Sequence, residues 1–421
     1  MCMNILDSFV ESVQGASGFY FLFEFALIIF AVKLMGHLST KIGQPSVFGK
    51  LLVGIILGPS LLNIIHPNEL ISEMAEVGVI LLMFLAGLET DLKEFMKNAF
   101  ASTTVAIGGI VFPFLGGLGL SLLFGYETNV AIFLGVLLVA TSVSISVQTL
   151  RELGKLKTRE GVTILGAAVL DDVLGIIILS AVLGLTVGGT AGASGLGAFG
   201  FTLLKIGLFF IIAIAIGYFV LPTLLKIFKR FQVSQTTLAF AIIVALLFAY
   251  MGEIFGVAGI VGSYVCGLML RLTPYSEEMT EQVEAFSYPF FVPLFFVNIG
   301  LVANFKEINT DVIWFSILLA VVAILGKIFG CALGAKVAKF STQSSFGIGA
   351  GMVARGEVGL IIAMIGIERG IISNDLFSAA IIVVIATTLV TPPLIKLLMK
   401  TDEEGIQATS SLSIAQKEDS F

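Results

Sequence analysis

The chain contains little charge and few of the side chains on which soluble enzymes and metal centres depend. Only 12% of its 421 residues are charged, whereas soluble proteins carry about 25%. Hydrophobic residues make up 57% of the chain, which is more apolar surface than a soluble protein of this length could bury. The composition therefore excludes a cytosolic enzyme and a disordered protein.

Cysteines and histidines are too few and too scattered to build a multi-residue centre. Cys2, Cys266 and Cys331 lie far apart without paired spacing, which argues against a disulfide framework or a zinc site. His37 and His66 are the only histidines. The net charge of −6 leaves no basic field for nucleic-acid phosphates. We therefore expect no cofactor and no nucleic-acid partner.

One glycine motif, GLGAFG at residues 195–200, fits the GxGxxG pattern of dinucleotide-binding proteins. That pattern holds phosphates only where it joins a strand to a helix, and here no predicted strand precedes it. We therefore predict a flexible connector at this point and no nucleotide partner.

Long apolar runs are abundant, and a run of about 20 apolar residues is long enough to cross a bilayer as a helix. We count thirteen, of which the second and ninth are short. They cover residues 19–40, 45–60, 73–90, 98–123, 128–150, 160–188, 198–225, 235–251, 256–271, 282–303, 311–338, 343–367 and 375–399. The sequence thus predicts an all-α polytopic membrane protein with about 13 transmembrane helices.

Basic residues gather at one set of helix ends, whereas the opposite set has only Lys205, Lys306 and Arg369. Because loops rich in lysine and arginine stay in the cytoplasm, we expect the N-terminus outside and the C-terminus inside the plasma (inner) membrane. Residues 1–17 would then form an extracellular tail, and the polar residues 401–421 a cytoplasmic tail.

The chain carries an internal repeat at an offset of 213 residues. The matching pairs are Gly49 with Gly262, Gly54 with Gly267, Gly87-Leu88 with Gly300-Leu301, and Lys93-Glu94 with Lys306-Glu307. The second to sixth helices therefore repeat as the ninth to thirteenth, and the odd shift of seven helices turns one copy upside down. Inverted repeats are typical of secondary transporters, which bind their substrate near the bilayer midplane. Within a membrane transporter domain at 18–400, we expect repeat one at about 44–182, linker helices at about 198–251 and repeat two at about 257–399.

Three charges lie at mid-helix positions, where a charge costs roughly 2.5–3.5 kcal/mol and needs a partner or water. Asp171 and Asp172 lie in GAAVLDDVLG, and Lys327 lies in VVAILGKIFG. Adjacent helical residues point about 100° apart, so one aspartate can pair with the lysine while the other faces a cavity. A buried carboxylate offers Na⁺ both charge and oxygen, and it can instead hold a proton because burial disfavours its charged form. The alternative is a structural ion pair with a spare acid.

Glycines favour a break in one segment, 343–367, while Ser and Thr in 128–150 also occur within intact membrane helices. VATSVSISVQ carries Thr141 and Ser142, whose hydroxyls could bind an ion or bond back to the backbone. The repeat places it over the glycine-rich segment that holds Arg355 and Glu357. Two broken helices crossing at the midplane would present carbonyls and helix ends to an ion. We interpret Arg355 and Glu357 as structural or gating charges, and we place Glu24 at a helix–helix or subunit interface.

These motifs together resemble the monovalent cation:proton antiporter-2 family, and within it the NapA-type sodium/proton antiporters. The resemblance covers about residues 18–400. It rests on LLMFLAGLETDL (81–92), ATSVSISVQTLRELG (140–154), GAAVLDDVLG (166–175), the Lys327 helix and GMVARGEVGLI (351–361). It implies an NhaA- and NapA-like fold in which two inverted five-helix repeats build a six-helix core that moves against a dimerisation domain. It also implies a homodimer, with the fifth and twelfth helices broken and crossing.

The resemblance implies roles for individual residues. Asp172 would be the main cation and proton carboxylate, and therefore the ligand of the transported Na⁺. Asp171 would be the partner of Lys327, and Thr141 and Ser142 would lie at the crossing. The implied activity is export of Na⁺ in exchange for H⁺, with Li⁺ as a further candidate cation. Exchange would be electrogenic if Lys327 takes up a second proton.

Other functions stay open at this point. Glutathione-gated potassium efflux relatives have Gln-Asp in place of Asp171-Asp172 and carry a cytosolic nucleotide-binding domain, so the Asp-Asp pair favours sodium. A potassium/proton antiporter of the same fold is the nearest alternative. A sodium-coupled symporter of an organic anion would need an anion-binding arginine, for which Arg355 is the only candidate. An ion channel would conduct without proton coupling, and a membrane enzyme would need a nucleophile and base that the sequence does not display.

Overall fold

The computed structural model describes residues 20–186, 192–231, 233–302 and 310–399, and its regular elements in this part are all helices. The predicted tails at 1–17 and 401–421 lie outside the described residues, as do Lys306 and Glu307 of the repeat. The helices are α2 (Tyr20–Lys41), α3 (Ser46–Leu57), α4 (Glu69–Glu89), α5 (Leu92–Lys97), α6 (Ala99–Leu123), α7 (Thr128–Leu137), α8 (Val143–Glu152), α9 (Arg159–Thr186), α10 (Gly192–Ala215), a π-helical turn (Ile216–Val220), α11 (Leu221–Phe228), α12 (Thr236–Phe255), α13 (Gly259–Leu270), α14 (Ser276–Ser287), α15 (Phe291–Leu301), α16 (Thr310–Val337), α17 (Thr342–Gly351), α18 (Glu357–Glu368) and α19 (Asn374–Leu398).

Eight of the described helices are long and apolar enough to cross a membrane, and the pair α14 and α15, bent by 50°, raises the number to nine. Helices α3 and α13 have only 12 residues each. At 1.5 Å per residue they rise about 18 Å, less than the roughly 30 Å of a hydrocarbon core. Two of the predicted spans, 128–150 and 343–367, are each divided into two shorter helices.

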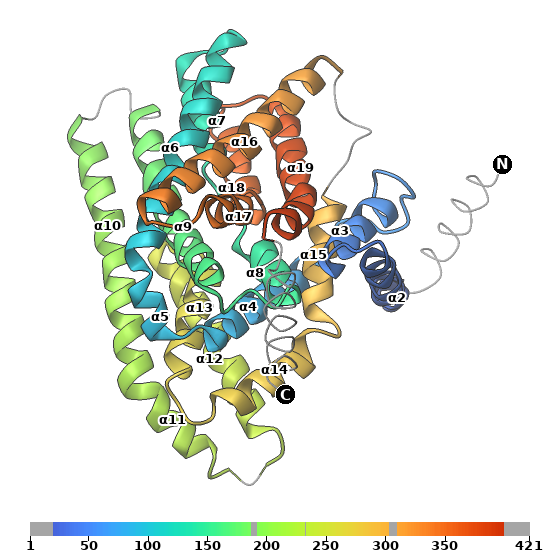
Figure 1. Cartoon of the computed structure of the whole chain (residues 1–421), viewed down its shortest axis with the longest axis vertical. Coiled ribbons are helices and arrows are strands. Elements are labelled where there is room, and N and C mark those ends of the chain that lie inside the picture. Colours follow the sequence, from blue (N-terminus) through green and yellow to red (C-terminus); the bar gives the residue numbers. More distant parts are fainter. Residues whose placement is uncertain (1–19, 187–191, 232, 303–309, 400–421) are drawn as a thin grey trace, which may run out of the picture.

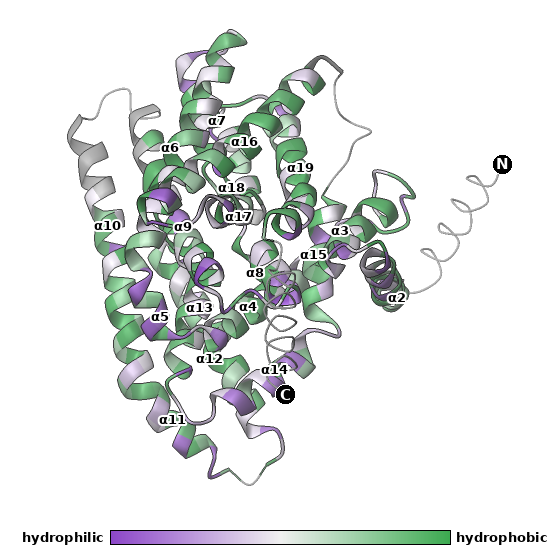
Figure 2. Cartoon of the chain, in the orientation of Figure 1, coloured by the Kyte–Doolittle hydropathy of each residue, from purple (hydrophilic) through white to green (hydrophobic). Residues whose placement is uncertain are grey.

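The connector predicted at residues 195–200 is wrong, because α10 begins at Gly192 and this segment is helical. Glycine disfavours a helix by about 1 kcal/mol relative to alanine in water. In an apolar environment the helix is nevertheless the way to satisfy the backbone polar groups. The outer face of α10 fits that environment, since Leu204 and Ile211 are 65% and 67% exposed, and the coloured part of this helix in Figure 2 is mainly hydrophobic.

The helices pack as two bundles joined by α10 (Figure 1). The first, which we call the core bundle, contains α6, α7, α8, α9, α16, α17, α18 and α19. The second, the flanking bundle, contains α2, α3, α4, α12, α13, α14 and α15. Helix α10 contacts α9 on one side and α12 and α13 on the other. Helix α8 bridges the two bundles, since it packs on α9 and also contacts α3 and α4.

Helices α6 and α16 make a backbone-to-backbone contact in the core bundle. A Cβ added at Gly108 would lie 2.1 Å from the carbonyl oxygen of Gly330, and one added at Gly330 would lie 2.2 Å from that of Gly108. No side chain fits at either position, so glycine allows the two helices to cross in direct contact. Lys327 lies on α16 about one turn before Gly330, and therefore close to this crossing.

Two glycine contacts in the flanking bundle are related by the offset of the sequence repeat. A Cβ at Gly54 on α3 would lie 2.7 Å from the Cα of Gly300 on α15. A Cβ at Gly267 on α13 would lie 3.1 Å from the Cα of Gly87 on α4. A shift of 213 residues turns Gly54 into Gly267 and Gly87 into Gly300. Each contact therefore becomes the other when the two halves of the chain are exchanged.

Candidate functional site

The two broken spans meet inside the core bundle. Helix α7 ends at Leu137 and α8 begins at Val143, while α17 ends at Gly351 and α18 begins at Glu357. The Ser142 amide donates to the Ala354 carbonyl at 2.7 Å, and the Ser146 hydroxyl donates to the Gly351 carbonyl at 2.5 Å. These bonds use backbone groups that an intact helix would have satisfied. The predicted breaks in both helices are therefore present, and they lie against each other.

Gly356 makes this close approach possible. A Cβ at this position would lie 2.7 Å from the Ser142 hydroxyl oxygen and 2.9 Å from its Cβ. Any larger residue would push the second break away from the first. At Gly356, therefore, glycine is required because there is no space for a side chain.

Arg355 joins the breaks to their neighbours. Its guanidinium is fully buried and donates to the carbonyls of Leu138 at 2.6 Å, Val353 at 3.0 Å and Ala323 at 3.3 Å. Leu138 follows the last residue of α7, so the cation lies at the negative end of that helix dipole. These contacts are all with backbone oxygens, which supports a structural interpretation of this residue. Glu357 begins α18, but its side chain lies outside the described residues.

Asp171, Lys327 and Thr141 form a buried cluster beside the first break. The Lys327 ammonium lies 2.8 Å from Asp171 Oδ2, and neither side chain is exposed. The Thr141 hydroxyl donates to the same oxygen at 2.5 Å. A charge taken out of water is tolerated when a partner and further hydrogen bonds compensate it. The pairing between α9 and α16 that the sequence predicts is thus present, and a residue at the first break completes it.

Space for the lysine comes from Gly109 on α6. A Cβ at Gly109 would lie 3.5 Å from the Lys327 ammonium nitrogen and 2.7 Å from the Cys331 sulfur. A larger side chain would therefore displace Cys331 and crowd the lysine. Sequence reasoning missed Gly109, because a glycine in a membrane helix carries no signal of what lies opposite it.

Asp172 follows Asp171 on α9 and is 3% exposed. Adjacent helical side chains point about 100° apart, so Asp172 and Asp171 leave α9 in different directions. Within the described residues, the buried hydroxyls of Ser142 and Ser144 and the second oxygen of Asp171 have no hydrogen-bond partner. The region thus combines a second buried carboxylate with hydroxyl and carboxylate oxygens, which are ligands that a hard monovalent cation prefers.

Glu24 lies away from this cluster. It is 6% exposed on α2 and hydrogen-bonds the side chain of Asn68, which precedes α4. Its position at a contact between helices of the flanking bundle agrees with the predicted helix–helix interface.

A cavity of about 270 Å³ lies between the two bundles. The flanking bundle lines it with α4, α12, α13 and α15, and the core bundle lines it with Val358 and Ile361 of α18. Polar walls come from Glu76, Glu253 and Asn298. Helix α18 begins at the second break, so one wall of this cavity is formed by the helix that follows the break. The sequence did not predict this cavity, because Glu76 and Glu253 lie near the ends of apolar runs, where acidic residues usually face solvent.

The known proteins that resemble this chain are sodium/hydrogen exchangers and antiporters. The family model described as sodium/hydrogen exchanger, transmembrane, matches residues 26–401. The chain is 46% identical over 391 residues to the Na⁺/H⁺-K⁺ antiporter GerN of Bacillus cereus, covering 93% of this chain and 99% of GerN. It is 37% identical over 374 residues to a Na⁺/H⁺ antiporter of Enterococcus hirae, covering 89% and 97%. The sodium proton antiporter MjNhaP1 of Methanocaldococcus jannaschii matches in fold with a TM-score of 0.72 at 18% identity, covering 91% and 98%.

Proposed function

The chain belongs to the transmembrane sodium/hydrogen exchanger family, and we propose that it is a secondary antiporter that exports Na⁺ in exchange for H⁺. The observation that carries the proposal is the buried Asp171–Lys327 pair with Asp172 beside it at the crossing of two broken helices. Relatives at 37–46% identity are Na⁺/H⁺ antiporters by name, and none of these names describes an enzyme.

Asp172 is the carboxylate for which Na⁺ and H⁺ compete in this proposal. Thr141 and Ser142 contribute oxygens at the crossing, and Asp171 holds Lys327. When the site faces the cytoplasm, Na⁺ displaces the proton from Asp172 and disturbs the Asp171–Lys327 pair. The core bundle then moves against the flanking bundle, and protons replace Na⁺ on the outer side. The inward proton gradient thereby drives Na⁺ out of the cell.

Exchange is electrogenic if Lys327 takes up a second proton from the outer side and releases it to the cytoplasm when Na⁺ disturbs its pair with Asp171. Two protons would then enter for each Na⁺ that leaves. One net charge crossing 100 mV is worth about 2.3 kcal/mol. The membrane potential would therefore drive transport together with the pH difference.

The finer architecture belongs to the same proposal. Thirteen crossings are proposed by adding the short helices α3 and α13 and the broken pairs α7–α8 and α17–α18 to the nine candidate spans. The exchange symmetry of the Gly54–Gly300 and Gly87–Gly267 contacts supports two repeats related by a two-fold axis. In the core bundle, α7 (Thr128–Leu137) and α17 (Thr342–Gly351) have the same length at an offset of 214.

We propose that the repeat is one helix longer than the sequence predicts. A Cβ at Gly49 would lie 2.3 Å from the carbonyl oxygen of Met35, and one at Gly262 would lie 2.2 Å from that of Phe248. Both glycines and both carbonyls are 213 residues apart. The contact of α2 with α3 thus corresponds to the contact of α12 with α13, which gives six helices in each repeat.

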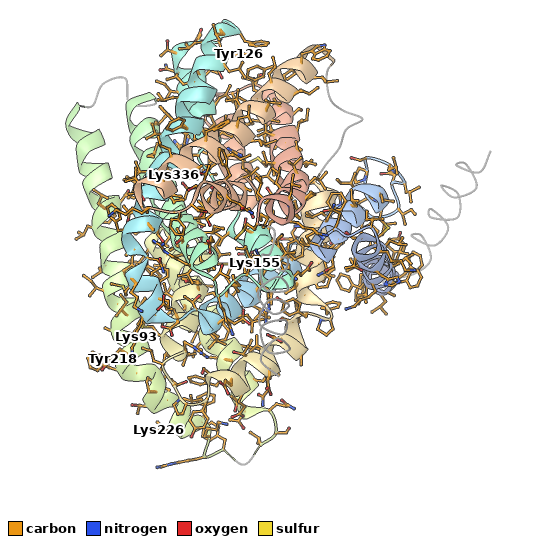
Figure 3. All side chains as sticks on the ribbon, viewed as in Figure 1. Lys93, Tyr126, Lys155, Tyr218, Lys226 and Lys336 are labelled. Atoms are coloured by element: carbon orange, nitrogen blue, oxygen red, sulfur yellow. The ribbon has the colours of Figure 1, made fainter. Side chains whose placement is uncertain are left out.

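The placement in the membrane is also a proposal: the plasma (inner) membrane, with residues 1–17 outside and 401–421 in the cytoplasm. In Figure 3, Tyr126 in the α6–α7 turn lies at the top, while Lys93, Lys155, Lys226 and Lys336 lie lower in the molecule. These lysines are spread from the upper half of the view to its bottom, so the lysine-rich side is proposed on the sequence. A homodimer is proposed on the family resemblance alone.

Potassium is the second candidate cation, because the relative GerN is a Na⁺/H⁺-K⁺ antiporter by name. A sodium-coupled organic-anion symporter is less favoured, since Arg355 is fully buried and donates to three backbone carbonyls. Reconstitution into liposomes containing a pH dye distinguishes a sodium antiporter from a potassium antiporter. We expect Na⁺ and Li⁺ to release trapped protons, and a response to K⁺ alone would reject the sodium proposal.

A further inference from the structure

The C-terminal end of α8 is fastened to the flanking bundle by Arg151. Its guanidinium lies 3.0 Å from Glu89 at the end of α4 and also forms an ion pair with Glu284 of α14. It donates to the Tyr288 hydroxyl at 2.9 Å and lies over the Tyr288 ring at 5.0 Å. The Tyr288 hydroxyl in turn donates to Gln148 at 2.9 Å. All of these contacts cross from the core bundle to the flanking bundle.

Glu152, the next residue, fastens α8 to a third helix. Its carboxylate accepts from the Ser46 amide and the Ser46 hydroxyl, each at 2.5 Å, and from the Val47 amide at 3.3 Å. It thus caps the N-terminus of α3, where exposed amides and the helix dipole favour an anion. The Lys50 ammonium lies 3.4 Å from the same carboxylate. The side chains of Lys50 and Glu152 are only 13% and 19% exposed, so solvent screens this pair less than an ordinary surface pair.

These contacts and the cavity occupy opposite ends of the interface between the bundles. On α4 the cavity is lined between Ser72 and Ile80, whereas Glu89 is the last residue of the helix. On the α14–α15 segment the cavity is lined by Phe295 and Asn298, whereas Tyr288 lies before α15 begins. The interface is therefore hollow toward one end and held together by charges at the other.

We propose that Arg151 and Glu152 are positioning residues for transport, which lock the two bundles together on the lysine-rich side. We call the contacts of Gln148, Arg151 and Glu152 with the flanking bundle the α8 lock. With the lock closed, the site is reached from the opposite, outer side through the cavity between α4, α13, α15 and α18. This inference rests on the proposed function and adds to it the access state and the residues that hold it.

The physical basis is that the lock joins bodies that the transport cycle must separate. Arg151 contacts Glu89 and Glu284 with one terminal nitrogen and Tyr288 with the other, and a charge-assisted bond is stronger than one between neutral groups. To expose the site on the lysine-rich side, α8 must move away from α3 and α4, and these bonds must break. The alternative is that these bonds persist in every state of the transport cycle and only brace the structure.

Ser144 provides a probe of unlocking. It is fully buried, and it lies on the same face of α8 as Gln148 and Glu152, four and eight residues earlier. A Ser144→Cys probe, in a chain whose three native cysteines are replaced by alanine, is shielded from the lysine-rich side while the lock is closed. Its labelling rate by a membrane-impermeant maleimide in inside-out vesicles then follows the unlocked population.

We expect Glu152→Gln and Arg151→Gln each to raise this labelling rate about tenfold, which corresponds to about 1.4 kcal/mol. Arg151→Lys keeps the charge but has only one terminal nitrogen. Its labelling rate should therefore fall between those of the unaltered protein and Arg151→Gln. The control is Lys97→Gln, which removes the exposed Glu94–Lys97 pair within α5 and crosses no bundle boundary. An unchanged rate in the Glu152 and Arg151 variants would show a brace and overturn the lock.

A transport measurement separates this inference from the proposed function. In liposomes of known orientation, weakening the lock should lower the apparent KM for Na⁺ on the lysine-rich side and raise it on the outer side. A purely structural defect would move both in the same direction or only reduce the maximal rate, and that result would overturn the lock. Labelling requires no transport, so a labelling response without any Na⁺/H⁺ exchange would reject the antiporter proposal and leave the lock intact.

Discussion

The Lys327 ammonium on α16 lies 2.8 Å from Asp171 Oδ2 on α9, and both side chains are completely buried. The two residues are 156 positions apart in the chain, and their helices come together in the core bundle, where α6 packs against both α9 and α16. The Thr141 hydroxyl donates to the same carboxylate oxygen, which links the pair to the first broken helix. A change of charge at Asp171 is therefore felt at the crossing.

Replacing Asp172 by asparagine should abolish exchange. The substitution keeps the shape of the side chain but removes the charge for which Na⁺ and H⁺ compete. Dye-monitored proton release from liposomes on addition of Na⁺ should fall to the protein-free baseline. The matched control is Asp375→Asn, an exposed acid in the first turn of α19, which should exchange normally. Retained exchange in the Asp172 variant would remove this residue from the central role.

Replacing Lys327 by glutamine should weaken the response of transport to voltage. If the lysine carries the second proton, its loss leaves one proton for each Na⁺ and no net charge movement. Exchange in K⁺-loaded liposomes should then become insensitive to potentials set with valinomycin, while the response to a pH difference persists. The same voltage dependence in the variant and the unaltered protein would count against the lysine as a proton carrier.

Stability should respond differently to single and double changes in this pair. Breaking a buried ion pair by removing one partner costs about 3–5 kcal/mol, whereas neutral replacement of both partners is often tolerated. Lys327→Met alone should therefore lower the melting temperature in detergent more than the double variant Lys327→Met with Asp171→Asn. Equal losses in the two variants would show that Asp171 is not destabilised by losing its partner.

The central site was predictable because charged residues in the middle of a membrane helix are energetically unfavourable. A charge in the middle of an apolar run requires a reason, so Asp171, Asp172 and Lys327 are conspicuous in the sequence alone. The glycines around Gly356 mark the second break in the same way. The division of the chain into helices in a membrane follows from the length of the apolar runs.

The α8 lock and the bend between α14 and α15 could not be predicted in this way. Arg151 and Glu152 lie at a helix end, where charges usually face solvent, and their partners come from the flanking bundle, on α3, α4, α14 and the turn before α15. The segment 282–303 reads as one apolar run, yet it contains a 50° bend before Phe291. Such features depend on contacts between distant segments, and hydrophobic periodicity carries no information about them.

Gly356→Ala tests whether the contact between the two breaks is required. A Cβ at this position would lie 2.7 Å from the Ser142 hydroxyl, so the breaks must separate and the Ser142–Ala354 hydrogen bond must weaken. We expect a loss of thermal stability of about 1–3 kcal/mol, which is typical of overpacking, together with loss of exchange. Gly359→Ala is the control on the same helix, since its Cβ would meet Val384 at 3.4 Å, an ordinary contact distance.

A second substitution shows whether crowding is the cause. Ser142→Gly removes the side chain that the new methyl group would strike, so in combination with Gly356→Ala it should recover part of the lost stability. Two changes that touch each other are expected to be non-additive, and the difference from additivity measures their contact. Strict additivity in thermal unfolding would place the two breaks apart. The crossing geometry on which the cation site depends would then be wrong.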